Sequence, residues 1–195
     1  MRPFVPLTRW RINGIGVNGS CPPISDTVGW RRTQRMPESK FTPAQAEELA
    51  SAFAREGVDY LFIGKSGAIL LGYPETTQDI DIFLPRSQEN AERVLRALHL
   101  LGFRLDPAER MSILSGSEII LLKGGPFALD LIHAPDGIED FDAARKRRVV
   151  EAGRFPIASL DDIIASKRAA GREKDLSDVR RLEQFKDEYL RRRKS

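Results

Sequence analysis

"FIGKSGAILLGYPETTQDIDIFLP", residues 62–85, places a glycine-rich turn about a dozen residues before two aspartates that are one residue apart. The end of the stretch, DIDIFLP, is apolar enough to predict a buried strand. Alternate side chains of a strand share a face, so Asp79 and Asp81 project together, away from the isoleucine between them. Neighbouring carboxylates repel each other unless a cation or a proton lies between them. Because Mg²⁺ prefers carboxylate oxygens, the pair predicts a magnesium site.

A third acid on another strand would complete such a site. Asp130 lies in FALDLIHA, residues 127–134, as the single charge of an otherwise apolar segment. An unpaired charge on a buried strand is costly, so Asp130 needs a partner. Each acid taken alone is equally compatible with a structural role, such as capping a turn, pairing with an arginine or binding a buried backbone group. We expect the three carboxylates to converge, because one metal site accounts for all of them.

The order of the predicted elements indicates the fold class. Thr42 and Pro43 favour the start of a helix that Gly57 ends, and Gly124 with Gly125 predicts a hairpin within residues 117–134. The other predicted elements are a strand at 58–64, a short helix at 66–73, a helix at 87–102, a short helix at 139–148, one or two edge strands at 149–158, and helices at 160–171 and 174–193. We predict an α/β (α+β) fold, with a mixed β-sheet flanked by helices and a helical C-terminal segment.

The chain is predicted to have three parts. Residues 1–40 are rich in Pro, Gly, Ser and Arg and show no helical or strand period, which predicts a disordered lead. If Met36 is the true start, most of this lead is instead untranslated sequence. Residues 41–158 are predicted to form the core domain, and residues 159–195 a helical segment packed on it.

Composition narrows the setting of the protein. Cys21 is the single cysteine, which excludes an internal disulfide, and there is neither an apolar run of eighteen residues nor a signal peptide. We expect a soluble cytoplasmic protein without a membrane partner. Residues 41–144 carry eight Lys/Arg against seventeen Asp/Glu, whereas residues 145–195 carry sixteen against nine. This asymmetry is typical of an acidic metal centre beside a basic surface for a polyanion, and equally of an ordinary charged helical tail.

The Gly-Lys-Ser of FIGKSG also has the form in which a phosphate-binding loop ends after a strand. That loop requires another glycine five positions before Gly64, where this sequence has Asp59. The spacing therefore argues against an ATPase of that type.

The turn, the spacer, Asp-Ile-Asp and the later single Asp together resemble the nucleotidyltransferase superfamily of polymerase-beta type over residues 58–134. GKSGAILLGYPETTQDIDIF and the late segment DDIIASKRAAGREKDLSDVRRL are most similar to the AbiEii/AbiGii and MenT-like toxin nucleotidyltransferases, which extends the match to residues 58–185. Lys65 departs from this pattern, because many relatives have a small residue there. Gln78 is a second departure, although Thr77 supplies the Thr-Xaa-Asp of the family.

The resemblance implies a magnesium-dependent enzyme that transfers a nucleoside monophosphate from a nucleoside triphosphate to an acceptor hydroxyl. The residues implied to be catalytic are Asp79, Asp81, Asp130 and Lys174, and the three aspartates among them are implied to bind Mg²⁺. The residues implied to bind the nucleotide are Gly64, Lys65, Ser66, Thr77 and Lys167.

The late segment matches the family through its lysines and aspartates. Lys174 with Asp175 corresponds to the family's Arg/Lys-Asp signature, and Asp178 to its structural partner. Lys167 lies seven residues before Lys174, so the two share a helix face if one helix runs through Gly171. A surface ion pair with a nearby aspartate is the alternative for each lysine.

The resemblance implies that the acceptor is the 3′ end of tRNA and that the protein is the toxin of a toxin–antitoxin system, with a cognate antitoxin as a partner. Basic runs such as RKRR at 145–148 and RRRK at 191–194 suit an RNA acceptor. The alternatives are transfer to a protein or small-molecule hydroxyl, and an inactive relative that binds RNA or another partner.

Overall fold

The computed structural model describes residues 40–194, all of which belong to one unit of the chain. Apart from Lys40, the predicted lead at 1–40 lies outside the described residues. The elements of the described range are α1 (Pro43–Glu56), β1 (Leu61–Ile63), α2 (Gly64–Leu70), β2 (Asp79–Phe83), α3 (Gln88–Leu100), α4 (Pro107–Ser115), β3 (Ile119–Leu122), β4 (Ala128–Ile132), α5 (Phe141–Arg147), β5 (Val149–Glu151), β6 (Phe155–Ile157), α6 (Leu160–Ala170) and α7 (Glu173–Lys194). The predicted α/β class is confirmed.

The strands form one mixed sheet in the order β3-β4-β2-β1-β6-β5. Strand β2 pairs antiparallel with β1 and parallel with β4, and β3–β4 is the predicted hairpin. The segment predicted to form one or two edge strands forms β5 and β6, of which only β5 lies at an edge, because β6 pairs with both β1 and β5. Strand β6 tolerates Pro156 at this inner position because it pairs with β1 through Ile157 alone.

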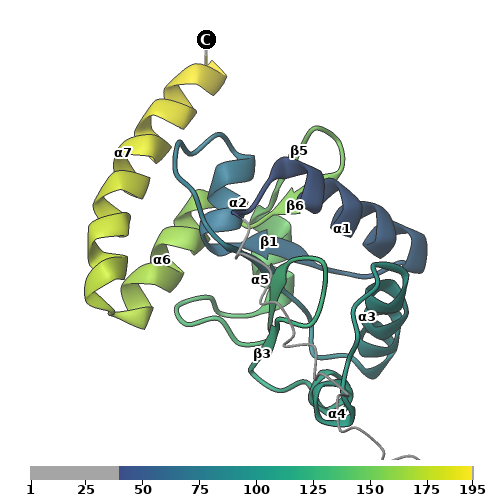
Figure 1. Cartoon of the computed structure of the whole chain (residues 1–195). Helices are drawn as coiled ribbons and strands as arrows, with labels where there is room; N and C mark the ends of the chain where they lie inside the picture. Colours follow the sequence, from purple (N-terminus) through teal and green to yellow (C-terminus); the bar gives the residue numbers. More distant parts are fainter. Residues whose placement is uncertain (1–39, 195) are drawn as a thin grey trace, which may run out of the picture. The chain divides into compact units, whose positions relative to one another are not determined.

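Helices pack on both sides of this sheet (Figure 1). Helices α1 and α3 contact each other, and α4 packs on α3. Helix α2 contacts β1, β2 and α6, and α6 packs along α7. None of the helices within residues 40–194 combines the length and the apolarity needed to cross a membrane.

Aromatic side chains join α1 to the centre of the sheet. The ring of Phe53 on α1 meets the ring of Tyr60 edge to face at 4.9 Å between centroids, and Tyr60 meets Phe62 of β1 at 5.5 Å. Phe62 in turn contacts Phe155 of β6 at 5.9 Å. These contacts fix β1, the strand that leads into the glycine-rich turn, against the core.

Helix ends follow the predicted signals where the sequence carries a cap. Thr42 and Gln45 form a capping box at the start of α1, and Gly57 ends it in the left-handed conformation. Helix α4 is an element that the sequence analysis missed, although Asp106 and Glu109 form a second capping box there. Strand β1 is shorter than predicted at both ends: it begins at Leu61 rather than Val58, and Gly64, its last expected residue, already begins α2.

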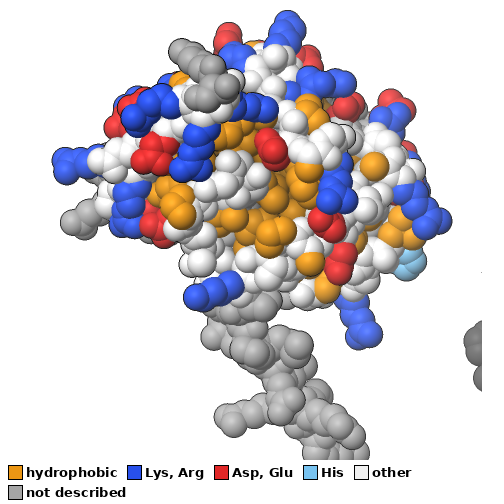
Figure 2. All heavy atoms as spheres, turned by 90° about the horizontal axis from the view of Figure 1, so that it is seen from above, with side chains coloured by type: hydrophobic (Ala, Val, Ile, Leu, Met, Phe, Trp, Pro, Cys, Tyr) orange, Lys and Arg blue, Asp and Glu red, His pale blue; other side chains and the backbone are white. Residues whose placement is uncertain are grey.

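Hydrophobic side chains also reach the surface, and Figure 2 shows them gathered on one face between Lys, Arg, Asp and Glu side chains. The large hydrophobic residues exposed in the described part of the chain are Leu100, Met111, Ile119, Leu121, Val150 and Leu190. Leucines of neighbouring strands differ in exposure: Leu121 of β3 is exposed, whereas Leu129 of β4 is buried.

This difference in exposure provides a matched test of the core. Leu129 of β4 is fully buried, so Leu129→Ala is expected to lower the free energy of unfolding by about 2–5 kcal/mol. Leu121 of β3 is 53% exposed, so Leu121→Ala is expected to change it by less than about 0.5 kcal/mol. Urea denaturation measures both values. Equal losses in the two variants would contradict the burial of β4.

Candidate functional site

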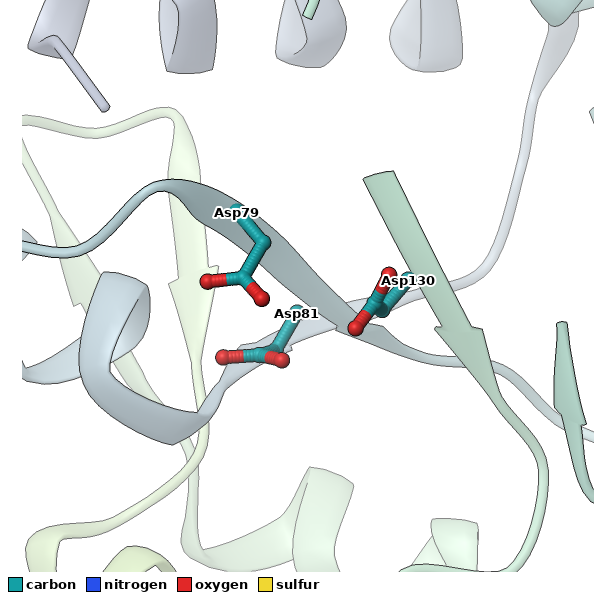
Figure 3. Close-up of side chains that lie close together, drawn as sticks. All are labelled: Asp79, Asp81 and Asp130. Carbon is teal, nitrogen blue, oxygen red and sulfur yellow. The ribbon is translucent and has the colours of Figure 1, made fainter. Parts of the chain in front are cut away.

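Three carboxylates converge on one face of the sheet. Each of Asp79, Asp81 and Asp130 offers an oxygen, and these oxygens all lie within 4.8 Å of one another. Figure 3 shows the two side chains of β2 and that of β4 pointing into the same space. The sequence-predicted acids are therefore brought together.

Strand register accounts for this convergence. Strands β2 and β4 are parallel neighbours, and Asp81 lies directly opposite Asp130. Residues that alternate with the acids, such as Ile80 and Leu129, are buried on the other face. Paired residues of adjacent strands present their side chains to the same face, so the carboxylates lie close together.

Burial and repulsion by neighbouring carboxylates raise the pKa values of Asp81 and Asp130 in the metal-free protein. Burial first, and then the charges of Asp79 and Asp130, raise the pKa of Asp81 to about 8, against opposing effects of Lys167 and the amide of Lys65. Burial and the charge of Asp79 raise the pKa of Asp130 to about 6, and Lys123 opposes this rise. A bound cation would remove the need for these protons.

The three acids fit a divalent metal ion. None of them forms a salt bridge with the described cationic side chains. Mg²⁺ takes oxygen ligands at about 2.1 Å, so two ligands of one ion are at most about 4.2 Å apart, close to the separation found here. The cluster would hold Mg²⁺ through Asp79, Asp81 and Asp130.

Gly64 allows the turn after β1 to approach the acids. Its φ of +60° is in the left-handed region, and a Cβ at this position would lie 2.1 Å from an oxygen of Asp81. Only glycine combines this conformation with this contact. The turn therefore closes one side of the acidic cluster.

Ser66 and Thr77 hold the acids in place. The Ser66 hydroxyl donates to the carbonyl of Ile63 and accepts the amide of Asp81 at 3.0 Å, and the side chain is fully buried. These bonds differ from the predicted contact of Ser66 with the nucleotide, because they occupy its hydroxyl within the fold. Thr77 lines the cleft described below, and its hydroxyl donates to Asp79 at 2.8 Å.

A second cluster combines lysines with their own carboxylates. Lys65 lies 2.9 Å from Asp178, and Lys167 lies 3.4 Å from both Asp175 and Asp178. Burial alone raises the pKa of Asp178, but its hydrogen bond with Lys65 and the charge of Lys167 hold the pKa below its usual value. Arg172, which the sequence analysis missed, lies 3.5 Å from Asp175. The sequence signal for Arg172 was that it directly follows Gly171, a residue type that can end a helix.

The two predicted lysines of the late segment lie on different helices. Gly171, with φ +64°, ends α6 in the left-handed conformation, so no single helix carries both Lys167 and Lys174. Lys174 lies in the first turn of α7, and its side chain is outside the described residues.

The acids and the lysines line one cleft of about 770 Å³. Gly64, Lys65, Thr77 and Lys167 of the predicted nucleotide-binding residues are at its surface. The charged residues that line it are Lys65, Lys167, Arg172, Asp79, Asp81, Asp130, Glu118, Asp136, Asp175 and Asp178. Among the described side chains of this cleft, three cations thus face seven acidic residues, so entry of a polyanion requires metal ions or protons to offset the negative charge.

The raised pKa values predict a pH-dependent response to Mg²⁺. The folded pKa of Asp81, about 8, exceeds its ordinary value of 3.8, so the unfolded chain loses this proton first as the pH rises. The metal-free protein therefore loses stability between about pH 4 and pH 8. We take a Mg²⁺ concentration ten times the dissociation constant measured at pH 8.5. It should raise the Tm by about 3–6 °C at pH 8.5, and the same concentration should raise it by less at pH 5.5. Thermal unfolding with and without Mg²⁺ measures this, and an equal rise at both pH values contradicts it.

Substitution of two glycines distinguishes the close contact at Gly64 from the effect of backbone strain alone. Gly64→Ala should weaken Mg²⁺ binding about 10–100-fold, because the added methyl group displaces the Asp81 carboxylate. Gly57→Ala is the matched control, since Gly57 has φ +69° and no atom within 4 Å of an added Cβ. Titration calorimetry with Mg²⁺ measures both affinities. Equal weakening in the two variants would show that backbone strain alone is responsible.

Comparison with known proteins adds no relative. A scan of the chain against protein-family models finds no match, and a search of curated proteins finds none either. The function of the cleft is therefore inferred from its own residues.

Proposed function

We propose that the protein is a Mg²⁺-dependent nucleotidyltransferase, which transfers a nucleoside monophosphate from a nucleoside triphosphate to an acceptor hydroxyl. The observation that carries this proposal is the presence in one cleft of a lysine cluster and of three converging carboxylates that form no salt bridge with a described cationic side chain. Phosphoryl transfer requires little more from a protein than positioning and charge neutralisation.

The two clusters divide the work of binding the triphosphate. Asp79, Asp81 and Asp130 would hold a Mg²⁺ ion, which would neutralise phosphate charge and lower the pKa of the attacking hydroxyl. Lys65 and Lys167 provide positive charge for the β- and γ-phosphates. Asp178 holds both ammonium groups at the edge of the cleft, so their charges are in place before the substrate arrives.

The proposed step is a displacement at the α-phosphorus. The acceptor oxygen forms a bond to that phosphorus as the bond to the bridging oxygen of the β-phosphate breaks. The bond's electron pair leaves with pyrophosphate, and the hydroxyl proton passes to Asp130. No oxidant, reductant or further substrate is needed.

An RNA 3′ end is the proposed acceptor, as the resemblance implies. Basic side chains along α5 and at the end of α7, many of them exposed, support an RNA partner. The toxin role and the cognate antitoxin stay predictions of the resemblance, because neither leaves a feature in the cleft.

Label transfer tests the proposal. The protein is incubated with each α-labelled nucleoside triphosphate, Mg²⁺ and either total RNA or total cell protein. We expect labelled RNA, and we expect Asp79→Ala to lower the transfer rate by about 10³-fold while the protein stays folded. Removing one of three repelling carboxylates relieves repulsion in the metal-free protein, so its Tm should not fall.

Asp142→Ala is the matched control, because Asp142 is an exposed aspartate of α5 outside the cleft. Labelled protein in place of RNA would favour the protein-hydroxyl alternative. Absence of label from every acceptor, or undiminished transfer by Asp79→Ala, would refute the proposed function.

A further inference from the structure

The edge strand β3 presents large apolar side chains to the cleft. Ile119 and Leu121 are 58% and 53% exposed, and both line the cleft. The residues that alternate with them, Ile120 and Leu122, are buried in the core. The register places Leu121 opposite Asp130, so the apolar pair is the immediate neighbour of the acidic cluster.

A cationic residue follows the apolar pair. Lys123 is exposed and directly follows Leu122, the last residue of β3, whose partner in the register is Leu129, the residue before Asp130. Glu118, at the other end of the strand, also lines the cleft. The exposed side of β3 thus offers an apolar pair that lies between one acidic and one cationic residue.

The order of the strands places this surface opposite the lysine cluster. Across the sheet, β3 carries the apolar pair, β4 carries Asp130, β2 carries the other two acids, and β1 leads into the turn with Lys65. Lys167 is on the Lys65 side, because both bind Asp178. In a phosphoryl transfer the attacking and leaving oxygens are roughly in line. If pyrophosphate leaves toward the lysines, the acceptor must approach from β3.

We propose that Ile119 and Leu121 form the acceptor platform, on which the base of the 3′-terminal nucleoside of a single-stranded RNA lies, with Lys123 at its phosphate. This inference rests on the proposed function and names the acceptor side of the same site. In the step described above, the attacking oxygen is then the 3′-hydroxyl of that nucleoside.

A nucleoside suits this surface better than a protein side chain does. The planar face of a base packs on exposed aliphatic groups without requiring any particular base, and this packing removes apolar area from water. The terminal nucleotide of an RNA also carries a 5′-phosphate that the neighbouring lysine can contact, whereas a serine or tyrosine side chain has none. The combination of an apolar pair and a cation therefore favours RNA.

RNA binding without turnover tests the platform. The full chain is titrated, in the absence of nucleoside triphosphate, into two 5′-fluorescein RNA oligonucleotides that differ only in having a normal or an abasic 3′-terminal residue. Fluorescence anisotropy gives the Kd of each. The variants are Ile119→Ser with Leu121→Ser, and the matched control is Met111→Ser with Val150→Ser, two exposed apolar residues outside the cleft.

We expect the wild type and the control variant to bind the normal RNA about five- to thirtyfold more tightly than the abasic RNA. The platform variant should bind both RNAs with nearly equal Kd. Lys123→Gln should weaken binding of both and reduce the salt dependence of log Kd by about 0.7 per decade, the effect of one lost phosphate contact on a single strand.

The platform would be overturned if the wild type bound the two RNAs equally, or if the platform variant kept the wild-type preference for the normal RNA. It would also be overturned if that variant bound a fluorescent nucleoside triphosphate more weakly while its RNA binding was unchanged. Labelling of a protein acceptor that the platform variant reduces would also overturn the RNA assignment. Failure of the proposed function is distinguishable, because it is seen as absent label transfer by the wild type, whereas the platform is read from RNA affinity.

Discussion

Repulsion among three carboxylates on one sheet face is the constraint on which the rest of the site depends. Parallel pairing of β2 and β4 forces Asp81 and Asp130 together, and the hydrophobic residues that alternate with them commit the opposite face to the core. A shift of register by one residue would place charges in the core and isoleucine in the cleft. The fold therefore cannot separate the acids, and only protons or a cation relieve their repulsion.

The lysines of the second cluster pair with carboxylates other than the three acids, although Lys167 still opposes the rise in the pKa of Asp81. Lys65 and Lys167 pair with Asp178, so they do not neutralise the three acids directly. A buried aspartate that binds two ammonium groups restricts both side chains, which lowers the entropy they lose when a phosphate binds. The cleft thus has an acidic region, a region of paired lysines and an apolar region along one strand.

Local signals predicted much of this arrangement. Alternation identified β2, and the charge of Asp130 in an apolar segment identified β4, because both patterns follow from the two faces of a strand. Sequence reasoning could not assign the hydroxyl of Ser66 to the amide of Asp81, since that bond depends on how α2 packs beside β2. The break at Gly171 was visible as a residue type, but the left-handed conformation was not. The exposure of Leu121 depends on which strand lies at the sheet edge, and a hairpin signal alone does not supply this.

Ser66 has a mechanical consequence. Its hydroxyl joins the end of β1, through the carbonyl of Ile63, to the backbone of β2 at Asp81. Gly64 and Lys65 lie between the joined points, so these two hydrogen bonds tie the turn to the acidic strand. In the proposed reaction, the groups that would face the leaving phosphates and those that would hold the metal are therefore linked through the fold. Such a preorganised constellation requires little rearrangement at the transition state, because folding has already fixed it.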